Sequence, residues 1–156
     1  MSTFRTISSF IGVALVIVYA IGSGLWVSSG DGWYQSLNAP SWQPPDWVFG
    51  VIWPYNFIVL GIASVLVSQR LTKTSVSLWI SIFAVSISFA LLWAYQFYQP
   101  HNLRFASLAL STAAVLTLPL LVIAYRASLP IFLALVPYQA WVVTASFLSW
   151  AYQRRN

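Results

Sequence analysis

The chain has no cysteine and very little charge. Seven Lys or Arg, two Asp and no Glu occur among its 156 residues, so charged side chains make up 6% of the sequence. A soluble domain carries about 25% charged residues, and the deficit excludes that class. The lack of cysteine also excludes disulfides, thiolate nucleophiles and sulfur ligands to metals.

Carboxylates and histidine are scarce as well. Asp31 and Asp46 lie between the first two apolar runs, and the single histidine, His101, lies in a predicted turn. Proton relays and ion pathways require ionisable residues within the membrane, and the apolar runs contain no Asp, Glu, Lys, Arg or His. We expect no metal site; His101 is interpreted as a solvated turn residue, with an axial haem ligand as the alternative. Scattered cations argue against nucleic-acid binding.

Hydrophobic residues make up 60% of the sequence, and the mean hydropathy is +0.79. Apolar runs of about 20 residues are long enough to cross a bilayer as helices. We therefore predict an all-α integral membrane protein, a single domain over residues 1–156, with one bundle of antiparallel neighbours joined by short turns. A signal peptide is the alternative for the first run, but its length favours an uncleaved span. The five predicted spans are residues 6–27, 47–69, 76–98, 105–125 and 130–152.

The basic residues flank these spans. Four fall on the N-terminal side of the membrane and three on the other, a split that favours an N-terminus facing the cytoplasm. The first group is Arg5, Arg70, Lys73 and Arg126, and the second is Arg104, Arg154 and Arg155.

The longest connection, residues 28–46, belongs to a stretch rich in tryptophan and proline. Residues 33–53 hold four of the nine tryptophans and three of the eight prolines. Pro40, Pro44 and Pro45 disfavour both helix and central strand, because each ring removes an N–H donor and restricts the preceding residue. We interpret the connection as a stiff lid over a site for a flat apolar ligand. The alternative is an interfacial loop with aromatic anchors and no ligand.

Three tryptophans lie deeper in the spans than an interfacial belt requires. Trp53 is six residues into the second span, so roughly 9 Å deep at the helical rise of about 1.5 Å per residue. Trp93 lies near the end of the third span and Trp141 near the middle of the fifth. Helix alternation directs these parts toward the long connection, so the three indoles either line one cavity beneath it or pack in the core.

Small residues recur on one face of the third span, at steps of four, three and four. Small side chains allow close helix approach in bilayers. The face therefore predicts a helix contact, either inside the bundle or in a homodimer with Ala84 and Ser88 at its centre. Its members are Ser77, Ser81, Ala84 and Ser88.

Two motifs resemble those of the tryptophan-rich sensory protein, or translocator protein, family. The first is WYxxLxxPxWxPPxxxFxxxW, running from Trp33 to Trp53, and the second is PYxxWxxxAxxL, running from Pro137 to Leu148. The segment WAYQFY, which begins at Trp93, is similar to a third-span segment of that family. The resemblance covers nearly the whole chain.

The resemblance implies a five-helix, commonly dimeric membrane protein. It implies a pocket under the first loop that binds porphyrins, haem, sterols or synthetic ligands. Some bacterial members of the family break down protoporphyrin IX in light, which makes Trp53 and Trp141 candidate catalytic residues. Carried over by position, the pocket residues are Tyr34, Pro44, Phe49, Trp53, Phe57, Trp93, Trp141, Ala145 and Leu148.

The chain departs from the family pattern at two places. Ala90 replaces an Asn three residues before the third-span tryptophan, and the fourth span lacks an early acidic residue, so we expect a drier pocket. A weak sterol motif is formed by Leu148, Tyr152 and Arg154. An arginine that snorkels at a helix end explains the same residues.

Three functions are consistent with these features. The first is a membrane receptor or transporter that binds tetrapyrroles such as protoporphyrin IX and haem. Sterols are a further candidate ligand, and the role would be porphyrin transport, sensing or stress regulation. The second is an enzyme that degrades protoporphyrin IX with light and oxygen, the ring stacked between Trp53 and Trp141. The third is a scaffold without a ligand. None requires a cofactor; the expected location is a bacterial cell membrane, with an organelle membrane as the alternative.

Overall fold

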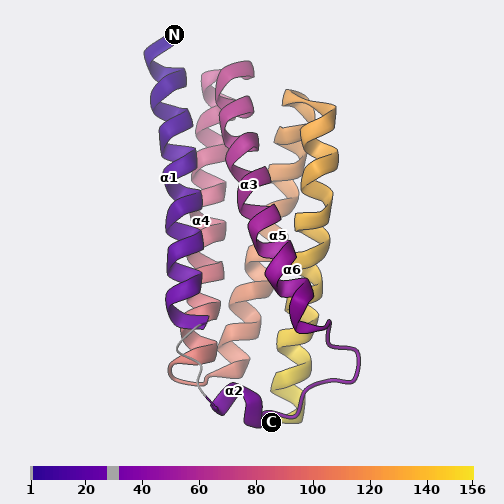
Figure 1. Ribbon diagram of the computed structural model, residues 1–156. Helices are drawn as coiled ribbons and strands as arrows, with labels where there is room; N and C mark the ends of the chain where they lie inside the picture. Colours follow the sequence, from indigo (N-terminus) through magenta and orange to yellow (C-terminus); the bar gives the residue numbers. More distant parts are fainter. Residues whose placement is uncertain (1, 28–31) are drawn as a thin grey trace.

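The computed structural model describes residues 2–27 and 32–156, and all regular elements in this part are helices, without strands (Figure 1). Five helices are long and apolar enough to cross a membrane. This confirms the predicted fold class. In chain order the helices are α1 (Ser2–Val27), α2 (Trp33–Ser36), α3 (Asp46–Arg70), α4 (Lys73–Tyr98), α5 (Leu103–Ala127) and α6 (Leu129–Arg155).

The predicted spans agree with the five long helices to within a few residues at each end. The helices extend further into polar sequence, because their end residues are satisfied locally. Thr72 accepts a hydrogen bond from the Ser75 N–H at the start of α4, and Asn102 accepts one from the Phe105 N–H at the start of α5. These side chains replace the carbonyl partners that a first helical turn lacks.

Two local expectations for the long connection were wrong. Residues 33–36 form the single turn α2, because the prolines that restrict the backbone begin only at Pro40. The second is a cap by Asp46, whose carboxylate at the start of the second predicted span suits a helix N-terminus. Pro45 occupies the cap position of α3 instead, and no side-chain cap bond forms. Asp46 is instead the first helical residue, where its charge favours the positive end of the helix dipole.

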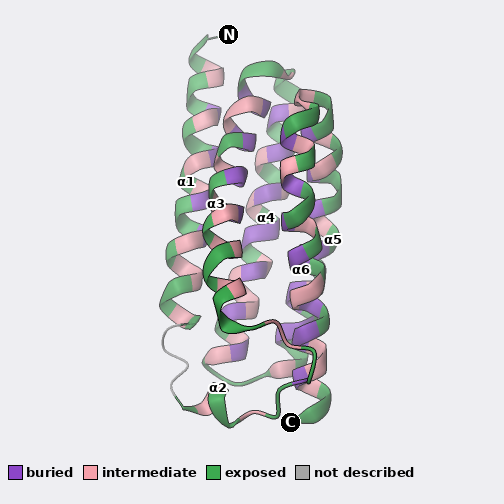
Figure 2. Ribbon diagram, turned by 45° about the vertical axis from the view of Figure 1, so that its right-hand side comes forward, coloured by how far each residue is buried: buried purple, intermediate pink, exposed green. Residues whose placement is uncertain are grey.

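The long helices form a ring in the order α1, α3, α6, α5 and α4, with α3 also touching α4 and α5. α1 packs only on α3 and α4, and Figure 2 shows that little of it is buried. It lies tightly against α3 at Gly12, where an added Cβ would lie 2.5 Å from the Ser64 Cβ. The Ser64 hydroxyl accepts a hydrogen bond of 3.1 Å from the Trp79 indole, which ties α4 to the same point.

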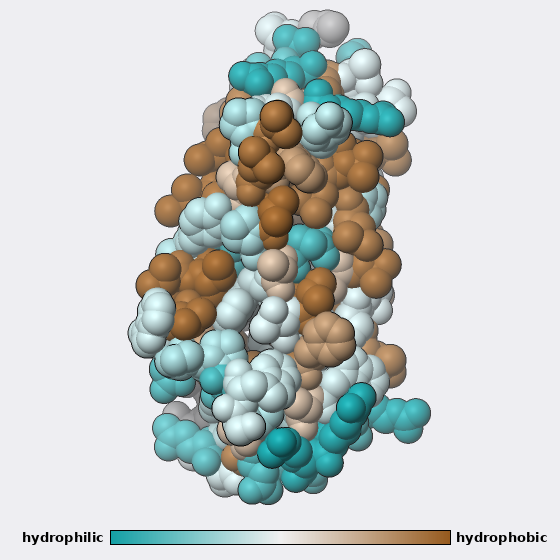
Figure 3. Space-filling view, turned by 90° about the vertical axis from the view of Figure 1, so that its right-hand side faces the viewer, coloured by the Kyte–Doolittle hydropathy of each residue, from teal (hydrophilic) through white to brown (hydrophobic). Residues whose placement is uncertain are grey.

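On the face shown in Figure 3, the hydrophobic side chains lie in the middle of the molecule, and the most hydrophilic ones gather at both ends. This banding is what a bilayer requires of the helices that cross it. The small-residue face of α4 belongs to this outer surface, since Ser77, Ser81 and Ser88 are exposed and Ala84 is half-buried. It therefore does not pack inside the bundle; the homodimer remains a prediction.

Candidate functional site: a cavity beneath α2

A cavity of about 250 Å³ lies at the α2 end of the bundle, among α1, α3, α4 and α6. Its wall is almost entirely apolar or aromatic and includes no charged residue among those described. The lining residues are Ala20, Ser23, Gly24, Val27, Tyr34, Phe49, Trp53, Phe57, Trp93, Phe97, Tyr98, Trp141, Ala145, Leu148, Ser149 and Tyr152.

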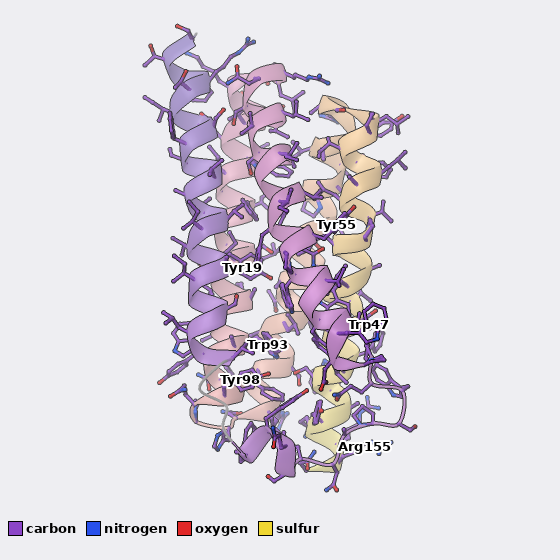
Figure 4. All side chains as sticks on the ribbon, viewed as in Figure 1. Tyr19, Trp47, Tyr55, Trp93, Tyr98 and Arg155 are labelled. Atoms are coloured by element: carbon purple, nitrogen blue, oxygen red, sulfur yellow. The ribbon has the colours of Figure 1, made fainter. Side chains whose placement is uncertain are left out.

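The inner end of the cavity is closed by aromatic contacts between α1 and α3. Tyr19 of α1 packs edge-on against Trp53 at 6.0 Å and against Phe57 at 5.3 Å between ring centroids. Tyr19 is labelled between the two helices in Figure 4. Trp53 stacks on Phe57 one turn away, at 5.7 Å. These large rings fill the space between α1 and α3 here, and the cavity lies on their α2 side.

Trp53 and Trp141 share the cavity wall but do not form parallel faces. Their centroids are 6.4 Å apart and their planes make an angle of 88°. The sequence suggested a flat ring stacked between the two indoles. This arrangement does not allow such stacking, because the two ring planes are nearly perpendicular. A flat ring can stack on one indole and meet the edge of the other, which is a favourable aromatic geometry.

The lid is held by contacts to two other segments of the same end. Trp33 stacks flat on His101 in the α4–α5 turn, with centroids 3.7 Å apart and planes 10° from parallel. The Tyr152 hydroxyl of α6 lies 3.2 Å from the Tyr34 hydroxyl and also donates to Gln43. His101, with its φ of 58°, is thus part of the lid contact rather than of the cavity lining.

The C-terminus gives the lid a further attachment. The backbone N–H of Asn38 donates a hydrogen bond of 2.8 Å to the Asn156 side-chain oxygen. Figure 4 shows Arg155 beside the lid at this end. The connection thus closes back on a helix that lies more than a hundred residues away in the chain.

The structure brings eight of the nine expected pocket residues to the cavity wall; Pro44 is the exception. Pro44 is half-buried in the connection, and only Tyr34 reaches the cavity from residues 33–46. Trp42 and Trp47 are exposed, at 49% and 70%, as interfacial anchors are. The lid interpretation therefore describes Tyr34, and the anchor interpretation describes Trp42 and Trp47.

Sequence reasoning missed the contribution of α1 and of the end of α4. Phe97 and Tyr98 line the cavity just beyond Trp93, and this cluster of aromatics was the available signal. The α1 wall is made of small side chains, and its signal was a helical spacing of three, one and three. These α1 residues are Ala20, Ser23, Gly24 and Val27.

The sterol motif does not form one site. Leu148 and Tyr152 line the cavity, but Arg154 is exposed outside it. The helical register explains the split, because Leu148 and Tyr152 are four residues apart and share a face, whereas Arg154 is two residues further round.

Polar atoms in and near the cavity are few, as the Ala90 substitution suggested. Ser149 shares a hydrogen bond of 2.9 Å with Ser107, and Ser23 donates to the Tyr19 carbonyl at 2.6 Å. Asn56, three residues after Trp53, is fully buried, and neither side-chain polar atom has a partner. Burying an unpaired amide costs free energy. The sequence analysis did not single out Asn56, although an amide inside an apolar span is visible in the sequence.

Comparison with known proteins assigns the family. The TspO/MBR family profile matches residues 10–155. Tryptophan-rich protein TspO of Chlorobaculum tepidum is 31% identical and aligns over 97% of this chain and 96% of its own length. Protein CrtK of Rhodobacter capsulatus is 30% identical and aligns over 83% of this chain and 82% of its own length. Human translocator protein is 28% identical and aligns over 87% of this chain and 82% of its own length.

The five apolar helices together with bacterial relatives make the chain a multi-pass integral membrane protein of the bacterial cell membrane. The relatives support a receptor or sensor role in that membrane. The chain belongs to the TspO/MBR family.

Proposed function

We propose that this protein binds tetrapyrroles, such as protoporphyrin IX or haem, in the cavity beneath α2 and acts in their transport or sensing. The observation that carries the proposal is the wall itself. Ring faces and edges of Trp53, Phe57, Trp93 and Trp141 meet at one apolar space. A flat conjugated ligand gains most from such a wall, because stacking and edge contacts add to the burial of apolar area.

The polar end of the cavity suits the polar edge of such a ligand. Tyr34 and Tyr152 have adjacent hydroxyls, and the ring of Tyr98 lies 5.8 Å from that of Tyr34. Phenolic hydroxyls can donate to carboxylates, and a porphyrin carries its two carboxylates at one edge. We expect that edge to point toward the lid, with Arg155, three residues after Tyr152 on α6, as a source of positive charge outside the cavity.

The size of the cavity limits how the ligand lies. Its volume of about 250 Å³ falls slightly below the range of about 300–1,000 Å³ for small-molecule sites. A macrocycle therefore extends through an open side of the cavity or widens it. A sterol, being bulkier across its plane, fits this wall less well than a flat ring.

The test is a titration of purified protein with protoporphyrin IX and haem, followed by the porphyrin absorbance and by tryptophan quenching. We expect saturable binding that weakens in Trp53→Phe. Trp47→Phe is the matched control, since Trp47 lies on the same helix but is 70% exposed and outside the cavity. Equal affinity in both variants, or no saturable binding at all, would contradict the proposal.

Light-driven degradation of protoporphyrin IX is the second candidate. It is favoured by the two indoles of Trp53 and Trp141, 6.4 Å apart at the cavity, since indole is an oxidisable side chain and no acid–base residue is needed. Porphyrin turnover measured in light and in the dark, with oxygen present, separates this activity from binding alone. Unchanged absorbance under light in a protein that binds the pigment leaves transport or sensing.

A further inference from the structure

We propose that the ligand enters and leaves the cavity sideways, from the lipid phase, between α1 and α3. This α1/α3 seam consists of Ala20, Gly24 and Val27 on α1 and of Gly50 and Trp53 on α3. The inference rests on the proposed function, in which the cavity takes an apolar ligand, and adds the route that the ligand follows.

Two sides of the cavity are closed by large side chains. Between α3 and α6, Phe49 packs edge-on against Trp141 with centroids 5.1 Å apart. Between α1 and α4, Trp26 packs against Tyr95 at 5.6 Å, and a Cβ added to Gly22 would lie 2.7 Å from Leu91. Neither side leaves room for a ring to pass without separating these helices.

The two ends of the cavity are closed as well. Toward the bundle centre, Tyr19 meets Trp53 and Phe57. Toward the water, Tyr34 bridges Tyr98 and Tyr152, with ring centroids 5.8 Å and 5.6 Å away. A ligand arriving from the aqueous phase would have to displace α2 together with its stack on His101.

The α1/α3 seam differs because small residues stand on both edges. Gly24 and Val27 are the exposed members of the cavity lining, so the cavity reaches the outer surface beside them. Gly50 is also exposed, and it shares a helix face with Trp53, three residues on. A Cβ built on Gly24 or on Gly50 meets no atom of the described residues within 4 Å.

The helical register turns Gly24 away from α4, and Gly24 lines the cavity from α1. Gly22 and Trp26, which contact α4, are each two residues away and so roughly 200° round the helix at about 3.6 residues per turn. Figure 1 shows α3 leaning away from α1 toward the α2 end. The helices thus separate beyond the Tyr19–Trp53 contact.

The outer surface around the α1/α3 seam is apolar. Ile21 and Leu25 on α1 are 59% and 66% exposed, and Val51 on α3 is 62% exposed. Gly24 is three residues from the end of α1 and Gly50 four from the start of α3, which places both about 4–6 Å inside the helix ends. The opening therefore faces the leaflet on the lid side, where an apolar pigment dissolved in the bilayer arrives edge-first.

The cysteine-free chain allows a reversible test of the route. Gly24→Cys is modified with a bulky apolar methanethiosulfonate, and porphyrin binding is followed by stopped flow in bilayer discs. An obstacle on the path slows passage in both directions, so the association and dissociation rates should each fall by about tenfold or more. A reducing agent should restore both rates.

Gly61→Cys with the same reagent is the matched control, because Gly61 lies on α3 with open space but away from the cavity. Trp33→Ala, which loosens the lid, should leave the rates unchanged. Unchanged rates in modified Gly24→Cys, or rates that rise in Trp33→Ala, would show that the ligand passes the lid and would overturn the proposal. A changed Kd with an unchanged association rate would do the same.

A ligand-independent measurement separates this inference from the proposed function. Ala145→Cys places a thiol in the cavity wall on α6, and an apolar maleimide should label it from the bilayer faster than a sulfonated one from water. Adding Gly24→Phe and Gly50→Phe should slow the apolar reagent by about tenfold. Faster labelling by the sulfonated reagent, or no effect of the phenylalanines, refutes the route whether or not a porphyrin binds.

Discussion

The two ends of the bundle are built from the same five helices but differ in how α1 meets α3. At the end away from α2, Gly12 lies directly against Ser64, and a Cβ there would approach to 2.5 Å. At the α2 end, the rings of Tyr19, Trp53 and Phe57 meet between the same two helices. Small residues let helices close on one another, whereas large rings hold them apart and leave a cavity beside themselves.

The largest expected effect comes from replacing the two cavity indoles by phenyl rings, which removes the oxidisable groups while keeping most of the apolar wall. Trp53→Phe with Trp141→Phe keeps much of the apolar contact, so tetrapyrrole affinity should fall by only about 1–3 kcal/mol. Any light-driven degradation should be nearly abolished, because phenyl is much harder to oxidise than indole. Parallel binding and illumination assays measure both effects.

The control for this pair is Trp42→Phe with Trp47→Phe, which removes two exposed indoles, one in the connection and one at the start of α3. It should change neither binding nor turnover. Degradation at the wild-type rate in the cavity double mutant would mean that breakdown is the pigment's own photochemistry.

The next largest effect is a loss of stability when the close α1–α3 contact at Gly12 is disrupted. Gly12→Val forces a side chain against Ser64 and the Trp79 hydrogen bond that Ser64 accepts, so stability should fall by about 1–3 kcal/mol, as in overpacked cores. Unfolding in mixed detergent micelles measures this. Gly61→Val, at a helical glycine with open space, should change stability by less than about 0.5 kcal/mol; equal losses would remove the distinction between the two ends.

The outer surface of α4 carries small residues as well, since Ser77, Ser81 and Ser88 are exposed there. Ala84→Leu should weaken a homodimer by about 1–2 kcal/mol, because it adds bulk where close approach is expected. The dimer fraction in bilayers, measured by energy transfer between labelled copies, reports it. Val85→Leu, one residue along on the exposed surface, is the control, and an unchanged dimer in Ala84→Leu places the interface elsewhere.

The smallest expected effect concerns Asn56, which lies between the two ends. Its buried amide has no partner, so Asn56→Leu should stabilise the fold by about 1 kcal/mol by removing an unpaired polar group of similar size. Thermal unfolding of the ligand-free protein tests it. Destabilisation would reveal that the amide has a partner, such as a bound water, in solution.

The sequence by itself determined the five membrane spans and the end of the bundle at which the aromatic residues gather. Both follow from local rules: an apolar run of sufficient length must be helical in lipid, since its backbone groups must pair with one another, and alternation of helices assigns each end to a side. The motif resemblance then named Trp53, Trp93 and Trp141, which the cavity brings together.

Only the tertiary structure decided which faces meet. Periodicity tells which residues share a helix face, not which neighbour that face turns toward. The sequence could therefore single out the small residues of α1 and the amide of Asn56, but it could not tell that Gly12 meets Ser64, that the small residues of α1 line the cavity or that Asn56 lies inside the bundle. The same holds for the 88° angle between Trp53 and Trp141, because a ring's orientation is set by the side chains packed around it. The position of Pro44 was also decided by the tertiary structure. The motif placed Pro44 in the lid over the pocket, but of residues 33–46 only Tyr34 of α2 lines the cavity.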